Sequence, residues 1–152
     1  MVSSQAPLAS WETFALSWDK GMGDEGNDYF RFLELPILEK LVDRSQGSRA
    51  LDLATGNGLV ARWLAEKSDS VIATDGAVAM IEYAKARTES TQHADKISFH
   101  HLDVTSESSW NAFMALEPSY TVSSYLTSDE NELNCTNFAD ATTRMTTSMS
   151  SQ

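Results

Sequence analysis

The sequence predicts an α/β protein built on a doubly wound parallel sheet. After residue 48, short apolar runs alternate with stretches whose apolar residues recur at helical spacing, in the order strand, helix, strand, helix, strand. That order is typical of parallel sheets with right-handed crossovers. A turn with two glycines follows the first strand. We therefore expect a Rossmann-like sheet, preceded by N-terminal helices and followed by a poorly ordered C-terminal tail.

The stretch Ser48–Gly58 is the predicted centre of the fold and reads Ser-Arg-Ala-Leu-Asp-Leu-Ala-Thr-Gly-Asn-Gly. Its apolar run predicts a short buried strand, and Gly56 and Gly58 predict a tight turn at the end of that strand. Residues Leu59–Lys67 have the spacing of an amphipathic helix. Because glycine lacks a side chain and a helix N-terminus has unpaired N–H groups, this turn is a predicted ligand cradle.

The remaining elements follow from the same periodicities. Pro36 either starts a second helix at its first position, where proline is tolerated, or kinks the first helix, and we prefer two short helices there. The other predicted elements are helices at Trp11–Trp18, Tyr29–Val42, Val78–Ala86 and Trp110–Leu116, and strands at Ser70–Thr74 and Lys96–Leu102.

The composition of the chain changes after Pro118. Of the 36 residues in 117–152, seven are Ser, seven are Thr and only Arg144 is basic. Such a composition supports little burial. We expect one domain over residues 1–118 and a disordered or non-native tail over 119–152, with Tyr120–Leu126 as a weak strand candidate.

The overall charge and the cysteine content exclude several classes of function. A formal charge of −11 argues against a nucleic-acid-binding surface, which needs clustered Lys and Arg. Cys135 is the single cysteine, so neither a disulfide framework nor a multi-cysteine zinc site is expected. No signal peptide or apolar run long enough to span a membrane is visible, and no His, Cys or carboxylate cluster has metal-ligand spacing. A cytoplasmic protein without membrane or metal binding is the expectation.

Three carboxylates, Asp52, Asp75 and Asp103, fall at or near the ends of the three predicted strands. Ligands of open parallel sheets bind outside the carboxyl ends of the strands, so these side chains should line one crevice. Asp75 lies 19 residues after Gly56, close to the spacing of a carboxylate that accepts from ribose hydroxyls. Asp103 is placed to accept from an adenine amine, and Asp52 supports the turn or, through water, an ammonium group. Aspartate is also a common turn former and N-cap, which is the structural alternative for each.

Two classes of cofactor fit the glycine turn. Residues Gly56–Ala61 match the Gly-x-Gly-x-x-Ala form of a dinucleotide fingerprint, with Asp75 as the ribose acid. Asp52 favours the other class, because a carboxylate four residues before Gly56 would repel a pyrophosphate and attract a ligand with positive charge. An NAD-binding oxidoreductase fragment remains the alternative.

The stretch Leu-Asp-Leu-Ala-Thr-Gly-Asn-Gly resembles motif I of the class I S-adenosylmethionine (SAM)-dependent methyltransferases. Ala-Thr-Asp-Gly at 73–76 resembles the acidic end of their second strand, and His-Leu-Asp-Val-Thr at 101–105 is similar to the end of their third. The aromatic and glycine-rich segment Trp18–Tyr29 resembles the N-terminal helices of small-molecule methyltransferases, including those of fungal secondary metabolism.

The resemblance implies a set of cofactor-binding residues. The methionine part of SAM would lie against the first strand end and the glycine turn, the ribose against the second strand end, and the adenine against the third. Ala54 stands where many members have glycine, a tolerated departure. The implied residues are Asp52, Ala54, Thr55, Gly56 and Gly58 for the methionine part and the turn, Asp75 and Gly76 for the ribose, and Asp103 and Val104 for the adenine.

The resemblance covers about Trp11 to Pro118 and then stops, whereas the family's sheet continues with a fourth strand beside the first. Losing that half of the sheet would expose an apolar strand edge. We therefore expect a truncated member of the family, and a partner chain that completes the sheet is the less favoured alternative.

Two functional hypotheses follow. The first is methyl transfer from SAM to a small-molecule metabolite, in which the protein supplies positioning and desolvation, so that no catalytic residue is assigned. The second is a non-catalytic remnant or a cofactor-binding module. His100 and His101 point to opposite faces of a strand, so at most one faces the crevice. The aromatic residues Trp11, Phe14, Trp18 and Tyr29 either pack into the core, the commoner role of such spacing, or cap the cofactor or an aromatic substrate.

Overall fold

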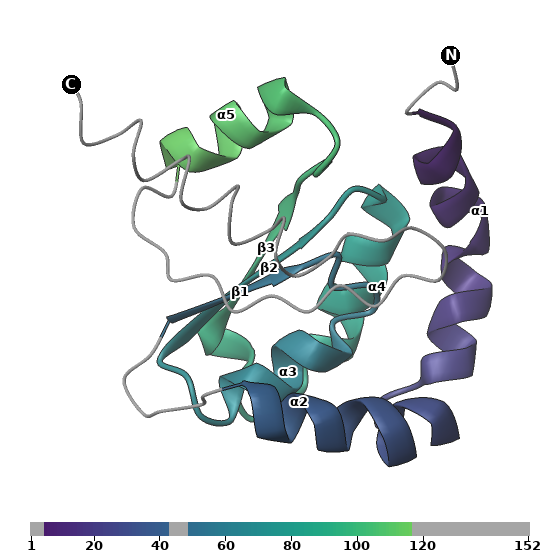
Figure 1. Ribbon diagram of the computed structural model, residues 1–152, viewed down its shortest axis with the longest axis vertical. Helices are drawn as coiled ribbons and strands as arrows, with labels where there is room; N and C mark the ends of the chain where they lie inside the picture. The colour runs from purple at the N-terminus through teal and green to yellow at the C-terminus, as the bar shows by residue number, and fades with distance from the viewer. Residues whose placement is uncertain (1–4, 43–48, 117–152) are drawn as a thin grey trace.

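The computed structural model of the chain describes residues 5–42 and 49–116. Within these ranges three strands alternate with helices, after an N-terminal pair of helical segments (Figure 1). The elements are α1 (Gln5–Met22), a π-helical segment η1 (Phe30–Glu34), α2 (Leu35–Leu41), β1 (Arg49–Leu53), α3 (Leu59–Ala65), β2 (Ser70–Asp75), α4 (Val78–Thr88), a 3-10 turn η2 (Ala94–Lys96), β3 (Ile97–His101) and α5 (Glu107–Leu116).

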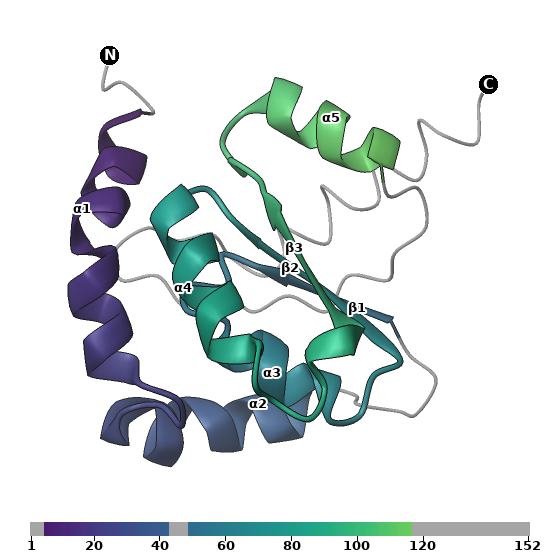
Figure 2. The same ribbon diagram turned by 180° about the vertical axis from the view of Figure 1, so that it is seen from behind.

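The sheet has the order β1-β2-β3, and both strand pairs are parallel. Leu53 lies opposite Thr74, and Asp75 lies opposite His101, so the carboxyl ends of all three strands meet at one edge. Figures 1 and 2 show α3 and α4 on one side of the sheet and α5 on the other. The predicted doubly wound α/β fold is confirmed.

Alternation along the strands creates two apolar cores, as expected when helices cover both faces of a sheet. One face carries Ala50, Val71 and Ala73 toward Trp63 of α3 and Leu38 of α2. Trp63 is 9% exposed, which agrees with the amphipathic helix predicted at Leu59–Lys67. On the opposite face three strand residues pack with one residue after β3 and one residue of α5: Leu51, Leu53, Ile72, Leu102 and Phe113.

Helix α1 packs along α4 beyond the end of the sheet (Figures 1 and 2). Ala15, 1% exposed, lies against Ala77 and Met80. At the end of this contact the guanidinium of Arg87 donates two hydrogen bonds to the carboxylate of Asp19, one of them 2.9 Å long. The same ion pair holds the pKa of Asp19 below its usual value. The α1–α4 contact therefore combines close apolar packing with a bidentate, charge-assisted pair.

The segment around Pro36 agrees with its prediction only in part, because Pro36 lies at the start of α2 but no break separates α2 from the helical segment before it. Instead of two short helices, the chain forms one continuous helical run in which the π-helical η1 leads directly into α2. The N–H of Leu35 bonds to the carbonyl of Phe30, five residues earlier, and Pro36 is in the first turn of α2. Proline has no N–H and crowds the preceding turn, and one wide turn accommodates it without ending the helix.

Helices α1 and α5 are longer than the apolar periodicity of the sequence predicted. Helix α5 begins at Glu107 because the hydroxyl of Ser106 accepts the N–H of Ser109 at 3.3 Å, as an N-cap does. Helix α1 covers Gln5–Met22 where Trp11–Trp18 was predicted. The predicted tail and the strand candidate Tyr120–Leu126 lie outside the described residues.

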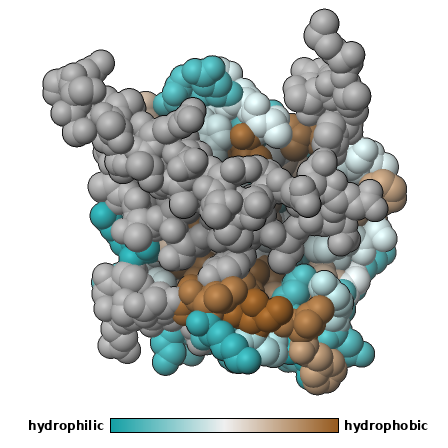
Figure 3. All heavy atoms as spheres, viewed as in Figure 1, coloured by the Kyte–Doolittle hydropathy of each residue, from teal (hydrophilic) through white to brown (hydrophobic). Residues whose placement is uncertain are grey.

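The outer side of α2 and its preceding turn carries exposed apolar residues. Figure 3 shows them as a brown patch low in the view, where Figure 1 places α2. Phe32 is 73% exposed and Leu41 62%. In the described part of the chain, no helix has both the length and the apolar character that crossing a membrane requires.

The α1–α4 ion pair yields a prediction about stability. Arg87→Gln should lower the free energy of unfolding by about 1 to 3 kcal/mol, because it leaves the Asp19 carboxylate, 9% exposed, without its charged partner. Lys85→Gln is the matched control in the same helix, since its pair with Glu82 is exposed on both sides and should matter by less than about 0.5 kcal/mol. Urea unfolding of both variants measures the difference, and equal losses would contradict the assignment.

Candidate functional site

The turn between β1 and α3 has an unusual backbone. Ala54, Gly56 and Gly58 have φ angles of 57°, 56° and 79°, all in the left-handed region. Glycine adopts this region freely, whereas alanine pays a steric cost. A Cβ on Gly56 would lie 3.2 Å from the indole Nε1 of Trp18, and one on Gly58 would lie 3.1 Å from the Cβ of Ala84. The two glycines therefore serve both the backbone path and the close packing around it.

Hydrogen bonds from the turn itself hold it against the strand ends. The N–H of Thr55 donates to the carbonyl of Thr74 at 2.8 Å, and its hydroxyl donates to the Asp52 carboxylate at 2.6 Å. The N–H of Gly56 donates to the Asp75 carboxylate at 2.9 Å, and that of Gly58 donates to the carbonyl of Thr55 at 2.9 Å. Three N–H groups of the turn thus have protein acceptors.

Asp52 lies beneath the turn and is 3% exposed. Burial is the main cause that raises the pKa of its carboxyl to about 7. The hydrogen bond from the Thr55 hydroxyl lowers this pKa, the charge of Asp75 raises it, and the hydrogen bond from the backbone N–H of Ala61 lowers it. Of the two roles predicted for Asp52, the structure shows direct support of the turn. Thr55, 7% exposed, directs its hydroxyl to this carboxylate.

Asp75 ends β2 and connects three elements. One carboxylate oxygen accepts the N–H of Gly56, and the other accepts the N–H of Ala77 at 2.9 Å, just before α4. Burial raises the pKa of Asp75, and these two backbone hydrogen bonds oppose the shift. A carboxylate has about four acceptor positions, so this one has capacity left for further donors.

Asp103 lies two residues beyond β3, beside the end of β2. A Cβ on Gly76 would lie 3.7 Å from the Cα of Asp103, so the loops after the two strands touch. One oxygen of Asp103 accepts both the N–H and the hydroxyl of Thr105, at 2.9 and 2.6 Å. Val104, 37% exposed, directs its carbonyl to the indole N–H of Trp110. The three predicted carboxylates therefore lie at one edge of the sheet, with Asp52 deepest.

Sequence reasoning missed the contribution of Glu12. Its carboxylate accepts the N–H groups of Val78 and Ala79, at 2.5 and 3.0 Å, and so caps the first turn of α4 from another helix. Leu8, one turn earlier in α1, lies 2.5 Å from where a Cβ on Gly76 would be. No local sequence signal marks a cap supplied from 66 residues away, and only the docking of α1 creates it.

Asn57, between the two glycines, was also missed. It is 1% exposed, and its amide donates to the Asp19 carboxylate and to the carbonyl of Gly23, at 3.3 and 3.0 Å. The backbone carbonyl of Asn57 accepts a hydrogen bond from the guanidinium of Arg62 at 2.7 Å. Asn57 thus fixes the glycine turn to the end of α1, and the only signal in the sequence was an asparagine between the two glycines of a predicted turn.

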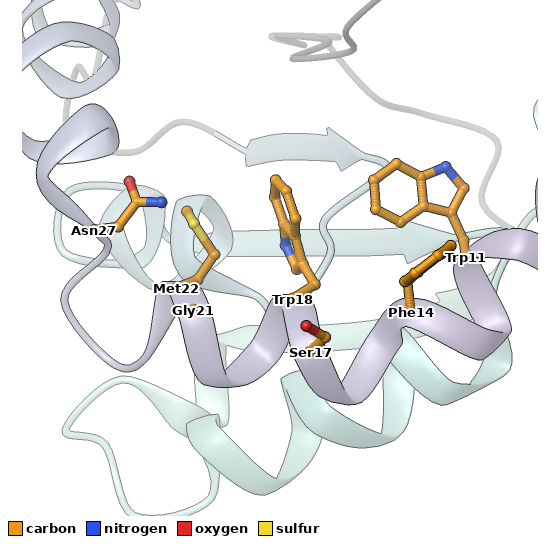
Figure 4. A pocket seen from close by; sticks show the side chains of 7 residues that line it. All are labelled: Trp11, Phe14, Ser17, Trp18, Gly21, Met22 and Asn27. Atoms are coloured by element: carbon orange, nitrogen blue, oxygen red, sulfur yellow. The ribbon is translucent and has the colours of Figure 1, made fainter.

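A pocket of about 300 Å³ lies on the side of α1 that adjoins the glycine turn. Trp11, Phe14, Trp18 and Met22 form its apolar walls, and Ser17, Gly21 and Asn27 complete it (Figure 4). The rings of Trp11 and Trp18 meet edge to face, with centroids 5.5 Å apart. The aromatic residues of α1 were expected to pack into the core, but Trp11, Phe14 and Trp18 are 43%, 60% and 40% exposed. That expectation was wrong for these three.

The two adjacent histidines face apart, as predicted. The ring of His100 packs edge to face on Phe113 of α5, with centroids 6.1 Å apart. Nε2 of His101 lies 2.9 Å from the carbonyl oxygen of Gly76, on the side of the strand ends. Across residues 5–42 and 49–116, no three His, Cys, Asp or Glu side chains form a group that could hold a metal ion.

This fold and site define a Rossmann-like α/β domain whose acidic strand ends surround a two-glycine turn. Residues 50–140 match the family model described as a methyltransferase domain, which is more than half of the chain. The chain therefore belongs to the methyltransferase domain family. The match runs past Pro118, the predicted end of the resemblance. No curated protein matches the chain.

Solved structures agree with this assignment. One chain of the complex between the Trm112 methyltransferase activator of Haloferax volcanii and its proposed methyltransferase is 25% identical, with a TM-score of 0.50 over 61% of this chain and 38% of that one. DhpI in its complex with SAM and HEP is 21% identical, with a TM-score of 0.54, and the match covers 88% of this chain and 70% of DhpI. A SAM-dependent methyltransferase of Anabaena variabilis is 20% identical, with a TM-score of 0.52, and the match covers 80% of this chain and 47% of that one. The chain spans less than half of the Haloferax and Anabaena chains, and the two relatives below 25% identity show the fold.

The strained residue of the turn gives one prediction. Ala54→Gly should raise the free energy of unfolding by about 1 kcal/mol or less, because relief of the left-handed strain exceeds the entropy that glycine adds to the unfolded chain. Ala86→Gly, the same change at an exposed position inside α4, should lower it by about 1 kcal/mol. Urea unfolding compares the two, and a loss at both positions would contradict the prediction.

The buried carboxyl of Asp52 gives a second prediction. Its folded pKa of about 7 lies above the ordinary 3.8, so between these values the folded state keeps a proton that the unfolded state releases. Stability from this group therefore falls as pH rises from about 4 to 7, by at most about 1.4 kcal/mol per pH unit, and levels off above that range. Between pH 5 and pH 8 the free energy of unfolding, measured with urea, should therefore fall less for Asp52→Asn than for the unchanged protein. Parallel losses would show that Asp52 ionises normally.

Proposed function

We propose that this domain binds SAM across the carboxyl ends of β1, β2 and β3 and transfers its methyl group to a small-molecule acceptor. The observation that carries this proposal is the Asp75 carboxylate, which lies against the N–H of the glycine turn and retains acceptor capacity. A carboxylate at the end of the second strand is suited to the two hydroxyls of a ribose. Membership of the methyltransferase domain family supports the same conclusion.

The hydrogen bonds of the site favour a sulfonium nucleoside over a dinucleotide. A pyrophosphate would need free N–H groups in the turn, but those of Thr55, Gly56 and Gly58 already donate to the protein. The Glu12 carboxylate takes the N–H groups of Val78 and Ala79, where a phosphate on the ribose would otherwise find donors. The contacts within the turn argue against the NAD-binding alternative, and the contacts of Glu12 argue against a dinucleotide with a phosphorylated ribose.

Each predicted residue receives a role in this proposal. Asp75 accepts from the ribose, with Gly76 leaving room beside it, and Asp103, with Val104, receives the adenine. Ala54, Gly56 and Gly58 form the wall against the methionine part, with Asp52 and Thr55 as the support beneath. When bound, SAM supplies an electrophilic methyl group, which bonds to the nucleophilic atom of the acceptor while the electron pair of the broken C–S bond returns to sulfur. A proton on that acceptor atom is released to solvent. The chain's contribution is positioning and exclusion of water, and we assign no catalytic residue.

The finer expectations from the sequence stay predictions. They are a fungal secondary-metabolite acceptor, a cytoplasmic location and a domain boundary at 118. A partner chain stays a further proposal, which the complex of the Haloferax relative with an activator chain supports. A cofactor-binding module without catalysis is the alternative function, and methyl-transfer assays distinguish it from the enzyme.

Calorimetric titration with S-adenosylhomocysteine tests the cofactor. The protein should bind it with a micromolar dissociation constant, and Asp75→Ala should weaken binding by about tenfold or more, because two charge-assisted hydrogen bonds to the ribose are lost.

Asp95→Ala is the matched control, since this exposed residue lies in η2, at the amino end of β3 and away from the site. Its affinity should equal that of the unchanged protein. Binding of NAD with none of S-adenosylhomocysteine would transfer the assignment to the dinucleotide class.

A further inference from the structure

The pocket on α1 is joined to the proposed cofactor site through one side chain. Trp18 forms a wall of the pocket, and its indole Nε1 would lie 3.2 Å from a Cβ on Gly56. Asn57 fixes the chain after α1 by donating to the carbonyl of Gly23. A molecule in this pocket would therefore lie beside the part of the glycine turn that the proposed function gives to the methionine end of SAM.

The lining of the pocket has a definite chemistry. Its walls are two indoles, a phenyl ring and a thioether, and none of its lining residues carries a charge (Figure 4). Rings pack favourably on such walls, both by burial and by edge or stacked contacts. A carboxylate or phosphate would lose part of its hydration there without gaining a cationic partner, which is costly. The formal charge of −11 on the chain further disfavours anions.

The polar groups of the pocket are suited to an oxygen atom of a ligand. The side-chain oxygen of Asn27 accepts the N–H of Phe30 at 2.9 Å, which leaves its amide nitrogen as the donor end. The hydroxyl of Ser17 lies on the same lining. These donors favour a hydroxyl or carbonyl oxygen on an otherwise apolar molecule.

We propose that this pocket binds the methyl acceptor, and that the acceptor is an uncharged aromatic compound of one or two rings with a hydroxyl group. The assignment as acceptor rests on the proposed function. A volume of about 300 Å³ is at the small end of the range for ligand pockets, which sets the limit on the number of rings.

Three probes with the same ring system test this proposal by calorimetry with the full chain: 2-naphthol, 2-naphthoate and 2-naphthylmethylammonium. The neutral 2-naphthol should bind at least about tenfold more tightly than the anion, because the lining offers no charge to pair with a carboxylate. Equal or tighter binding of 2-naphthoate would overturn the proposal. Tightest binding of the ammonium probe would overturn it in favour of amine acceptors held by cation–π contacts.

Two variants with a control locate the binding in this pocket. Phe14→Ala should weaken 2-naphthol binding about fivefold or more, because it removes an aromatic wall. Leu16→Ala, the control, changes a residue of α1 that is 48% exposed and does not line the pocket, and should leave binding unchanged. Gly21→Leu fills the pocket, since a Cβ there would meet nothing within 4 Å, and leucine also favours the helix. It should abolish binding without unfolding the protein, as checked by circular dichroism.

Titration of the same samples with S-adenosylhomocysteine separates the two proposals. If S-adenosylhomocysteine binds and 2-naphthol does not, the acceptor proposal is wrong and the proposed function is unaffected. If 2-naphthol binds selectively and S-adenosylhomocysteine does not, both the proposed function and the acceptor role are overturned. If Phe14→Ala and Leu16→Ala bind 2-naphthol equally, the ligand lies elsewhere and the pocket proposal fails.

Discussion

The Asp75 carboxylate is the contact on which the arrangement of the site depends. It accepts one N–H from the turn after β1 and one from the residue before α4, so a single side chain at the end of β2 fixes both connections. Parallel pairing places the end of β2 between the ends of β1 and β3. Burial favours the neutral form of this group, while the two backbone donors favour the charged one. The chain thus holds an acidic group at the centre of its strand ends, where a ligand with hydroxyl donors would compensate part of its desolvation.

The sequence predicts the strands, the glycine turn and the grouping of three carboxylates, because these features follow from local patterns. Short apolar or alternating runs, glycines one residue apart and acidic strand ends are visible without tertiary information. The contribution of α1 was not predictable in the same way. Glu12 caps α4, and Asn57 bonds to the end of α1, through contacts between residues 34 to 67 positions apart. No periodicity encodes such a pairing, which exists only once α1 has docked.

The aromatic residues of α1 show why hydrophobicity alone misplaced them. The stripe that packs on the domain carries Leu8, Glu12, Ala15 and Asp19, at the spacing of one helix face. Ala15 lets α1 approach α4 closely, whereas a bulky ring at that position would hold the helices apart. The large rings of Trp11, Phe14 and Trp18 lie on the neighbouring stripe, where they line a hollow. Size, as well as polarity, decides which face of a helix becomes its contact face.

The cap that Glu12 places on α4 links two motions of the molecule. Any displacement of α1 from the strand ends withdraws this carboxylate from the amides of Val78 and Ala79 and leaves them to water. The first turn of α4 directly follows Asp75 and Gly76, so its fraying would loosen the same loop that carries the acidic group. Undocking of α1 and disorder at the end of β2 are therefore thermodynamically coupled: whatever holds one in place also rigidifies the other.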